Sequence, residues 1–571
     1  MTGSAGAKES TSSLPRSNNA PFGSVHPGLK ECLLVFAAAF LVLFLLNNRF
    51  VNLYDEGLML TAVMRTMAGQ VLHRDFYYNY GPGQLYLLAG LFKVFGTSVL
   101  VERLTLAFAS SGLVLSVYVL ARKFCSQAIS FAAAVLCLTW ILGELMRQAV
   151  MNPLIPTLAL WACWMVVPVN DARLQRRRAA IAGVLSGVLF LFRYDMGIGL
   201  LVANLFGVAV VLWMRERGLG RAVHSLVKRI LWPYVAGFAI VSVPAMLAYL
   251  SVAPLHDLLY DIVLYSSKYY RVARRLPFPW RHSGRLFEDF VVYALPLLMA
   301  VSVWAAYRWM NPRRISEDEA SATPQCSAML ILLSVAAAMM YVKGLVRVGA
   351  GQMNASTMLC VLMAAILFQY RRRLESWAQI SFAAAAILLV TTAFSAALGK
   401  VEAGGHLQPM VINRLVSPNR HPPSPLLKSW CKLDEPVTRG MCFEMDPDHM
   451  QAVEYLVAHT TPADTLYVGL SHHDRIFIND NATYFAAQRL PATKWSHFDP
   501  FLQNREDIQK EMIGELERNK PPYVVLDSEY DKIFEPNGSS VSTGVHILDE
   551  YIAAHYTPVQ TFGELVILKR N

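Results

Sequence analysis

The sequence predicts a mainly α-helical, polytopic membrane protein with a separate α/β domain at its C-terminal end. Of its 571 residues, 54% are hydrophobic and only 16% are charged, whereas soluble domains usually carry about 25% charged residues. Long apolar segments recur up to Leu398 and then stop, after which short helical and strand patterns alternate. These observations exclude a soluble or disordered chain. The net charge of +10 fits the basic cytoplasmic loops of membrane proteins, and we predict no nucleic-acid partner.

Eleven apolar segments match the length of a membrane span, which takes about 17 to 25 helical residues. Two of them are separated only by the turn Phe192-Arg193-Tyr194-Asp195. The predicted spans lie near residues 31–47, 98–121, 126–144, 150–169, 179–192, 196–214, 230–250, 286–307, 326–341, 355–370 and 377–398.

Loop charges predict the orientation of these spans. Basic residues gather in alternate loops, for example Arg176–Arg178 and Arg371–Arg373, and short basic loops are cytoplasmic. Residues 1–30, rich in Ser, Gly and Pro, are therefore predicted to form a disordered cytoplasmic tail. The spans form a membrane domain at 31–399 with a first outer loop at 48–97. An odd number of spans places 400–571 on the extracytoplasmic side of the plasma (inner) membrane.

The exported segment is predicted to be a small layered α/β domain. Apolar periodicity indicates helices at 448–459, 504–518 and 545–554, strands at 465–470 and 523–526, and a final hairpin of 559–562 with 565–569. Cys431 and Cys442 are the two cysteines of this segment; they either form a disulfide in an oxidising compartment or remain reduced. His472-His473-Asp474, followed by Asn479-Asp480-Asn481, matches no metal-ligand spacing, so we predict no metal site there. No cofactor is certain, and a divalent metal at the paired carboxylates Asp55-Glu56 stays open without being indicated.

An acidic pair, Asp55-Glu56, follows the first span. Carboxylates at this depth are costly unless they are paired or functional. One interpretation is that both are solvated interfacial charges next to a turn at Gly57. The other is that they belong to an active site at the membrane surface.

The rest of the first outer loop favours the second interpretation. An amphipathic stretch at 58–68 is followed by GQVLHRDFYYNYGPG at 69–83 and by an apolar helix ending at Phe95-Gly96. This order, with its G-x-x-x-x-x-D-F-x-x-x-Y-G-P core, resembles the first extracytoplasmic loop of the GT-C fold glycosyltransferases. It is similar to the bacterial branch of protein O-mannosyltransferase-like and lipid A aminoarabinose transferase-like enzymes. The resemblance is close over 33–103 and looser elsewhere.

The resemblance implies a GT-C fold and an inverting transfer of one sugar from a polyprenyl phosphate in the membrane to a hydroxyl of a glycan, lipid or protein acceptor. It assigns the general base to Asp55, and Glu56 then holds the acceptor or tunes its neighbour. Excess outer-loop cations are candidates for binding the donor phosphate. These cations are Lys343, Arg347, Arg271, Arg274 and Arg275.

The resemblance also implies that adjoining outer loops share one cavity, which makes five further outer-loop residues candidates for the sugar and acceptor pocket. They are Asp195, Arg193, His73, Asp75 and Tyr80. Each assignment has a plainer alternative: the cations can contact lipid headgroups, Arg193 and Asp195 can simply pair, and Tyr80 can belong to the interfacial aromatic belt.

Three other functions compete with the transfer of a single sugar. A ligase or oligosaccharyltransferase would move a whole glycan from the same kind of carrier. A transporter would place charged residues along several spans, whereas here nearly all lie at helix ends and in loops, with Glu102, Arg103 and Glu144 the nearest exceptions. A non-catalytic envelope-assembly protein would not need Asp55.

Overall fold

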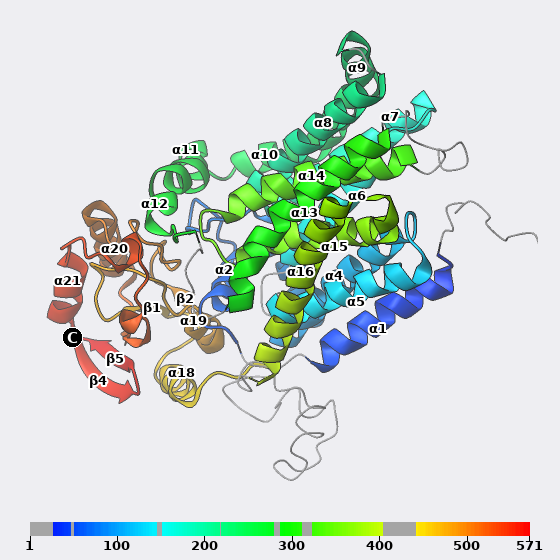
Figure 1. Cartoon of the computed structure of the whole chain (residues 1–571). Helices are drawn as coiled ribbons and strands as arrows, with labels where there is room; N and C mark the ends of the chain where they lie inside the picture. The colour runs from blue at the N-terminus through cyan, green and yellow to red at the C-terminus, as the bar shows by residue number, and fades with distance from the viewer. Residues whose placement is uncertain are drawn as a thin grey trace, which may run out of the picture.

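The computed structural model describes residues 27–46, 51–144, 151–216, 219–278, 286–310, 323–402 and 441–571. A bundle of long helices makes up most of the molecule, and a small sheet with its own helices sits at one end of it (Figure 1). Most of the predicted N-terminal tail, through residue 26, and Cys431 lie outside the described residues.

A helix occupies each segment that was predicted to span the membrane. Seven helical stretches of the described chain are long and apolar enough to cross a bilayer. The chain is therefore mainly helical and polytopic, as predicted. The bundle helices are α1 (Leu29–Leu45), α4 (Val99–Ala121), α5 (Gln127–Glu144), α6 (Met151–Val166), α7 (Ala172–Phe192), α8 (Tyr194–Glu216), α10 (Trp232–Leu250), α13 (Leu286–Met310), α14 (Thr323–Gly344), α15 (Asn354–Gln369) and α16 (Ser376–Glu402).

Two of these helices extend beyond the apolar segments that predicted them. The first turns of α7 carry basic residues, and α10 continues a helix that begins as α9 (Leu219–Leu226) and passes through a π-helical turn, η1 (Val227–Leu231). Apolar patterning marks the part of a helix that lies in the hydrocarbon, so helical residues outside that layer escape it.

Two helices of the first outer loop and a chain of short helices lie between the bundle and the sheet. The first pair is α2 (Asp55–Met67) and α3 (Gly83–Phe95). The chain of short helices was not predicted, because contacts with distant segments fix it. For example, Tyr265 is buried, and its hydroxyl donates a hydrogen bond to Pro500 O at 2.9 Å. The short helices are α11 (Leu255–Leu259), η2 (Tyr260–Leu264), η3 (Ser266–Tyr270) and α12 (Arg271–Ala273).

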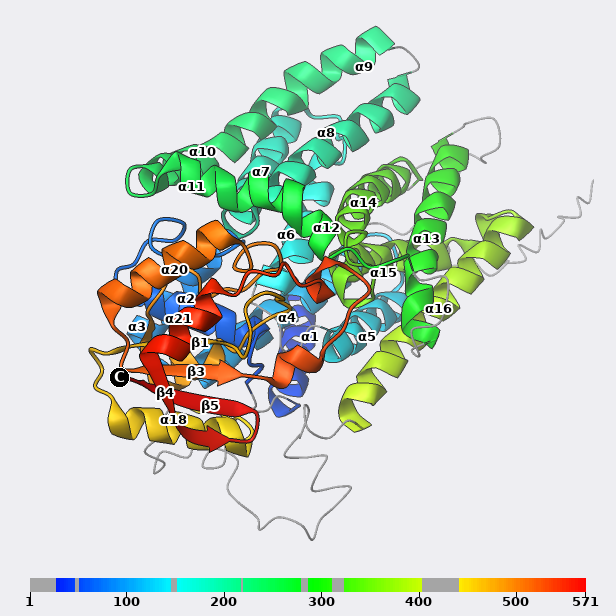
Figure 2. The ribbon, with the colours of Figure 1, turned by 90° about the vertical axis from the view of Figure 1, so that its left-hand side faces the viewer.

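The C-terminal part contains a five-stranded sheet of order β2-β1-β3-β5-β4 (Figure 2). β1 pairs in parallel with β2 and β3, and β5 pairs antiparallel with β3 and β4. Only α19 and β2 escape the sequence pattern, since both are too short to show a period. The elements are α18 (Pro447–His459), β1 (Thr465–Leu470), α19 (Ala482–Ala487), β2 (Leu490–Pro491), α20 (Glu506–Asn519), β3 (Tyr523–Asp527), α21 (Ile547–His555), β4 (Tyr556–Phe562) and β5 (Leu565–Arg570), with short helical turns at η8 (Glu529–Lys532) and η9 (Gly538–Ser540).

The sheet is packed on both faces, and each face shares a core with the outer loops. On one face, Leu466 and Val468 join a buried cluster that includes Leu58 and Met59 of α2. On the other face, Tyr467 belongs to a cluster with residues of α20 and α21 and with buried tyrosines of the outer loops. Cys442, at the start of this part, is disulfide-bonded.

The two parts approach each other closely at Gly57 of α2. Asn481 N and Ala482 N, at the start of α19, both donate to Leu53 O, at 2.9 and 3.1 Å. A Cβ on Gly57 would lie 2.4 Å from Ala482 N, a distance that no side chain can occupy without moving backbone. Glycine at this position therefore lets α2 and α19 touch.

We expect Gly57→Ala to destabilise the protein by about 1 to 3 kcal/mol, the usual cost of overpacking a tight contact. The matched control is Gly90→Ala in α3, where an added Cβ meets no atom within 4 Å and alanine favours the helix. Thermal unfolding midpoints of the detergent-solubilised proteins test this. Equal midpoints for the two variants would contradict the contact.

Candidate active site

Asp55, the predicted base, is the first residue of α2, and its side chain is exposed. The preceding turn is fixed by Asn52, whose Oδ1 accepts hydrogen bonds from Asp55 N at 2.7 Å and Tyr54 N at 3.1 Å. Glu56 Oε2 accepts a hydrogen bond from Asn52 N at 3.0 Å. This reciprocal cap works like a capping box and holds Asp55 at the positive end of the helix dipole, where negative charge is favoured.

Glu56 points into the protein instead. It is buried, and its Oε1 lies 2.7 Å from Nη2 of Arg103, a buried residue of α4. Glu102 Oε2 lies 3.6 Å from Nε of the same arginine. Buried charges are tolerated only when paired, so Arg103 is what allows Glu56 to be inside. The two adjacent carboxylates therefore have opposite environments.

Two predicted arginines act electrostatically on Asp55. Solvent reaches the Asp55 carboxylate, but the surrounding protein partly desolvates it and so raises its pKa above the ordinary value. The negative charge of Glu56 raises this pKa further, whereas the positive charges of Arg274 and Arg347 lower it. Asp55 thus faces positive charge from two separate outer segments. An ionised carboxylate near neutral pH with a raised proton affinity is suited to accept a proton.

Arg274 is buried against the C-terminal part. Its Nη2 donates to Phe477 O at 2.6 Å and lies 3.6 Å from Asp499 Oδ1. Asp499 Oδ2 accepts a hydrogen bond from the Tyr77 hydroxyl at 3.0 Å. The pairing fixes α12 and the first outer loop to the same carboxylate, so Arg274 is held in place before any ligand binds.

A buried histidine completes this wall. His497 Nε2 lies 3.2 Å from the Tyr54 hydroxyl and 3.4 Å from Asp499 Oδ2. Burial lowers the pKa of His497, Arg274 adds to this effect and Asp499 opposes it. His497 is therefore neutral at neutral pH, and it links the residue before Asp55 to the Asp499 carboxylate.

The other predicted arginines differ in their exposure to solvent and in whether they form an ion pair. Arg347 forms a two-pronged ion pair with Glu535, with Nη1 at 3.0 Å from Oε2. Arg271 and Arg275 are exposed and form no ion pair with any residue in the described ranges. The four arginines of the cation group therefore differ: Arg274 is buried, Arg347 is half-buried with a carboxylate partner, and the other two are exposed.

Arg193, Asp195, Lys343 and Tyr80 come together at the α7–α8 turn. Arg193 donates to both carboxylate oxygens of Asp195, at 3.0 and 2.9 Å, and its guanidinium lies 5.3 Å from the centre of the Tyr80 ring. Lys343 Nζ lies 2.9 Å from Asp195 Oδ2. Burial raises the pKa of Tyr80, and both Arg193 and Asp55 act on that hydroxyl electrostatically, which connects this group to the base.

The Gly-Pro motif holds Tyr80 in this position. Gly81 N donates to Phe192 O at 3.1 Å, and a Cβ on Gly81 would lie 2.3 Å from Leu191 O. The backbone of the first outer loop therefore touches the end of α7 directly, and any larger residue at 81 would separate them.

His73 and Asp75 lie in other surroundings. His73 is buried with its Nδ1 2.7 Å from Asp261 Oδ2. Asp75 pairs with Arg74 at 2.8 Å and accepts a hydrogen bond from Val71 N at 2.7 Å. Both residues stabilise the loop between α2 and α3, and neither joins the group around Asp55 and Tyr80 through a recorded contact.

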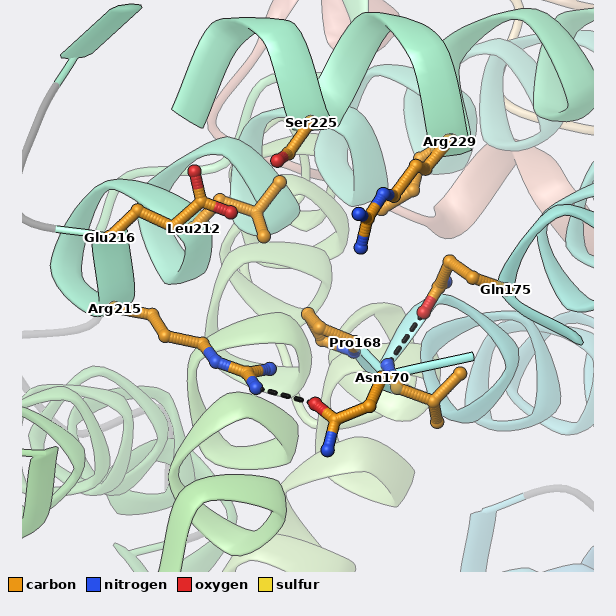
Figure 3. Close-up of a pocket in the computed structure, with 10 residues that line it drawn as sticks. Pro168, Asn170, Gln175, Leu212, Arg215, Glu216, Ser225 and Arg229 are labelled. Atoms are coloured by element: carbon orange, nitrogen blue, oxygen red, sulfur yellow. Dashed lines mark hydrogen bonds between the residues drawn. The ribbon is translucent and has the colours of Figure 1, made fainter. Parts of the chain in front are cut away.

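A cavity of 160 Å³ lies beside the end of α8 and the α9–η1 helix (Figure 3). Arg215 and Arg229 point toward it, and Arg215 Nη2 donates to Asn170 Oδ1 at 2.8 Å. None of the predicted site residues lines this cavity. The basic residues that line it lie at the end of α8 and in η1, in a segment that the charge pattern predicts to be cytoplasmic.

Sequence reasoning missed Tyr54, His497, Asp499 and Glu535 as parts of the site. The last three belong to the C-terminal part, and no spacing relates them to the first outer loop. The sequence signal was slight: a polar run, Ser496-His497, between the large apolar residues Trp495 and Phe498.

Comparison with known proteins identifies the fold. No protein-family model matches the sequence, and no curated protein does. Among solved structures, the chain matches membrane enzymes of the GT-C glycosyltransferase fold with probability 1.00. The chain therefore has the GT-C fold.

The individual matches are distant in sequence. ArnT from Cupriavidus metallidurans, solved with undecaprenyl phosphate, has a TM-score of 0.53 and 13% identity over 95% of this chain and 98% of ArnT. The oligosaccharyltransferase AglB from Archaeoglobus fulgidus, with an inhibitory peptide and dolichol-phosphate, has a TM-score of 0.48 and 13% identity over 88% of this chain and 70% of AglB. Mycobacterial arabinofuranosyltransferase AftD has a TM-score of 0.44 and 13% identity over 96% of this chain and 40% of AftD.

The opposite environments of the two adjacent carboxylates give a stability prediction. Glu56→Gln leaves buried Arg103 without its 2.7 Å partner, and breaking a buried ion pair costs about 3 to 5 kcal/mol; Glu102 remains nearby, so we expect the lower end of this range. Asp55→Asn, at an exposed helix start, should cost less than about 1 kcal/mol. Unfolding midpoints test this, and an equally large loss in Asp55→Asn would contradict the environments described.

Proposed function

We propose that this protein is an inverting glycosyltransferase that moves one sugar from a polyprenyl-phosphate donor to an acceptor hydroxyl on the extracytoplasmic face of the membrane. One observation carries the proposal: in a GT-C fold, an exposed carboxylate with a raised pKa, Asp55, faces Arg274 and Arg347. The undecaprenyl phosphate in the ArnT structure supports a donor on a lipid phosphate.

The proposed reaction needs a base and a cationic partner. Asp55 takes the proton of the acceptor hydroxyl while its oxygen attacks the anomeric carbon. The bond between that carbon and the phosphate oxygen breaks, and its electron pair leaves with the lipid phosphate. Arginines beside the site stabilise the charge that develops on the phosphate. Attack from the side opposite the leaving group inverts the anomeric centre.

The cations have unequal roles in this proposal. Arg271 and Arg275 are exposed and can first attract the phosphate, because they form no ion pair within the described ranges. Arg347 can exchange Glu535 for the phosphate, since a two-pronged guanidinium fits both groups. Arg274 stays with Asp499 and supplies a fixed field. Glu56 acts as a positioning residue through its pair with Arg103.

The Arg193, Asp195, Lys343 and Tyr80 group is the proposed sugar pocket. A guanidinium, an ammonium and a carboxylate give donors and an acceptor for sugar hydroxyls, and the Tyr80 ring gives an apolar face. His73 and Asp75 then shape the loop rather than contact the sugar. The acceptor is a glycan, lipid or protein hydroxyl, and the N-terminus is cytoplasmic in this orientation.

The central test is the release of free polyprenyl phosphate, measured by mass spectrometry, from a panel of polyprenyl-phosphate sugars with cell-envelope material as acceptor. We expect release from one sugar by the wild type and a loss of at least about 100-fold in Asp55→Asn, the usual effect of removing a general base. Glu511→Gln, at an exposed position on α20, is the control and should match the wild type.

Two outcomes would contradict the proposal. Equal release by the wild type and Asp55→Asn would remove Asp55 from its role. No release from any sugar by folded protein, with a control enzyme active, would reject the transfer of a single sugar.

The pH dependence tests the electrostatics of the base. Asp55 works in its ionised form, so activity falls as pH drops through the pKa of Asp55, and this fall is the acid limb of the pH profile. Burial raises that pKa above the ordinary aspartate value of about 3.9, so the acid limb lies at a higher pH. Arg347 lowers the pKa of Asp55, so Arg347→Ala should move the limb to higher pH. Arg372→Ala, an exposed change in a distant loop, should leave it in place. An unshifted or lower limb in Arg347→Ala would be inconsistent with this electrostatic effect.

A further inference from the structure

A histidine and three carboxylates converge where β1 and β3 end. These parallel strands lie side by side with α18 against the sheet (Figure 2). His449 comes from α18, Asp480 from the loop before α19, Asp527 from the last position of β3, and Glu529 from the turn that follows. One ligand atom each from His449, Asp527 and Glu529 lies within 4.8 Å of the others.

The inner atoms of this cluster point at one another and lack other partners. His449 Nε2 lies 3.8 Å from Asp480 Oδ2 and 3.9 Å from Asp527 Oδ2. All three residues are buried, with 3%, 1% and 0% of their surface exposed, and none of these three atoms has a hydrogen-bond partner. Buried polar atoms are normally satisfied, so three such atoms directed at one point indicate that something else binds there.

The cluster also has an excess of negative charge. None of Asp446, Asp480, Asp527 or Glu529 forms an ion pair with a lysine or arginine in the described part of the chain; the only cation partner recorded for the first three is His449. Asp480 and Asp527 are buried and share one histidine as their partner, and buried charge that is not fully balanced is unfavourable. A bound cation would remove this cost.

Asp446 supplies the remaining feature of a metal site. Its Oδ2 lies 2.6 Å from His449 Nδ1, the ring nitrogen that faces away from the cluster. Its Oδ1 accepts hydrogen bonds from the first turn of α18, which fixes the carboxylate. A histidine that binds a metal through one nitrogen usually donates its other N–H to such a carboxylate. Asp446 thus lies on the Nδ1 side of the ring, while Nε2 is the nitrogen near Asp480 and Asp527.

We propose that His449 Nε2, Asp527 and Glu529 bind one divalent transition-metal ion, Zn²⁺ or Mn²⁺, and that Asp480 Oδ2, 3.8 Å from His449 Nε2, lies beside the ion. Imidazole nitrogen together with carboxylate oxygen suits these ions. Tetrahedral ligands with bonds of about 2.0 to 2.2 Å lie roughly 3.3 to 3.6 Å apart. His449 Nε2 and Asp527 Oδ2, at 3.9 Å, would approach by a few tenths of an ångström, and the exposed Glu529 side chain, within 4.8 Å of the other ligand atoms, would move by up to about 1 Å. Glu529 is exposed and gives the ion a route from solvent.

The position of Asp480 gives the ion a structural role. Its Oδ1 accepts hydrogen bonds from Ala482 N at 2.7 Å and Thr483 N at 3.2 Å and so caps α19. Ala482 N also approaches Leu53 O, two residues before Asp55. A metal at this site would therefore connect α18 and the sheet to the segment that supports Asp55. The site does not depend on the proposed transferase activity.

Metal content tests this proposal on the full-length protein in detergent. The protein is stripped with a chelator, loaded separately with Zn²⁺ and Mn²⁺, dialysed and analysed by mass spectrometry for metal per chain. We expect about one equivalent of one of these ions and a thermal midpoint that rises by several degrees on loading and falls again with chelator. Mg²⁺ and Ca²⁺ should give neither effect.

Two variants and a matched control localise the ion. His449→Asn should retain less than a tenth of an equivalent. Because a buried change can impair folding, Glu529→Gln removes a ligand at the exposed edge, and it should weaken binding by at least about tenfold. His472→Asn alters a half-exposed histidine 3.2 Å from Asp474 in the same domain and should bind as the wild type does. Less than a tenth of an equivalent in the wild type, or equal retention by Glu529→Gln, would overturn the proposal.

Discussion

The buried ion pair between Glu56 and Arg103 fixes the start of α2, and the direction of Asp55 depends on it. Neighbouring residues on a helix point about 100° apart, so when Glu56 is held inside by Arg103, Asp55 must face outward. The cap from Asn52 reinforces the same geometry because Asn52 contacts both residues. A pair of adjacent carboxylates thus separates into one that anchors the helix and one that is available to solvent.

The surroundings of Asp55 come from both parts of the molecule. The bundle and its loops contribute Arg347, Arg274 and the Tyr80 group, whereas the C-terminal part contributes His497, Asp499 and Glu535. Backbone contacts such as that between Gly57 and Ala482 leave no room for side chains between them. The sheet is therefore a structural wall of the site, since removing it would leave Arg274 without Asp499 and Arg347 without Glu535.

The sequence predicted the parts of this arrangement that have a local physical signal. Apolar length indicated every bundle helix, and periodicity indicated β1, β3 and α18 with nearly their observed bounds. Asp55 could be singled out because it lies in a loop that resembles the first outer loop of GT-C enzymes, and Arg274 and Arg347 because basic residues are in excess in their outer loops. The partners of these residues could not be predicted from the sequence. Asp499 and Glu535 are ordinary acidic residues of a hydrophilic segment, and only the packing of Tyr77 and α12 against that segment gives them a role. The sequence does not indicate Asp480 as part of a metal site, because its neighbour His449 is too far away in sequence to form a recognisable metal-ligand spacing.

The ion pairs around the site also determine which cations can change partners. Arg274 and Asp499 expose 4% and 2% of their side chains, so separating them would leave two charges in a poorly solvated interior. Arg347 and Glu535 expose 26% and 14%, and Lys343 and Asp195 expose 47% and 37%, so water can solvate the carboxylate that an incoming anion displaces. Exchange is thus cheapest at Lys343, intermediate at Arg347 and most costly at Arg274. Under the proposed function, a donor phosphate would therefore displace Glu535 from Arg347, whereas Arg274 would stay with Asp499 and keep its electrostatic effect on Asp55.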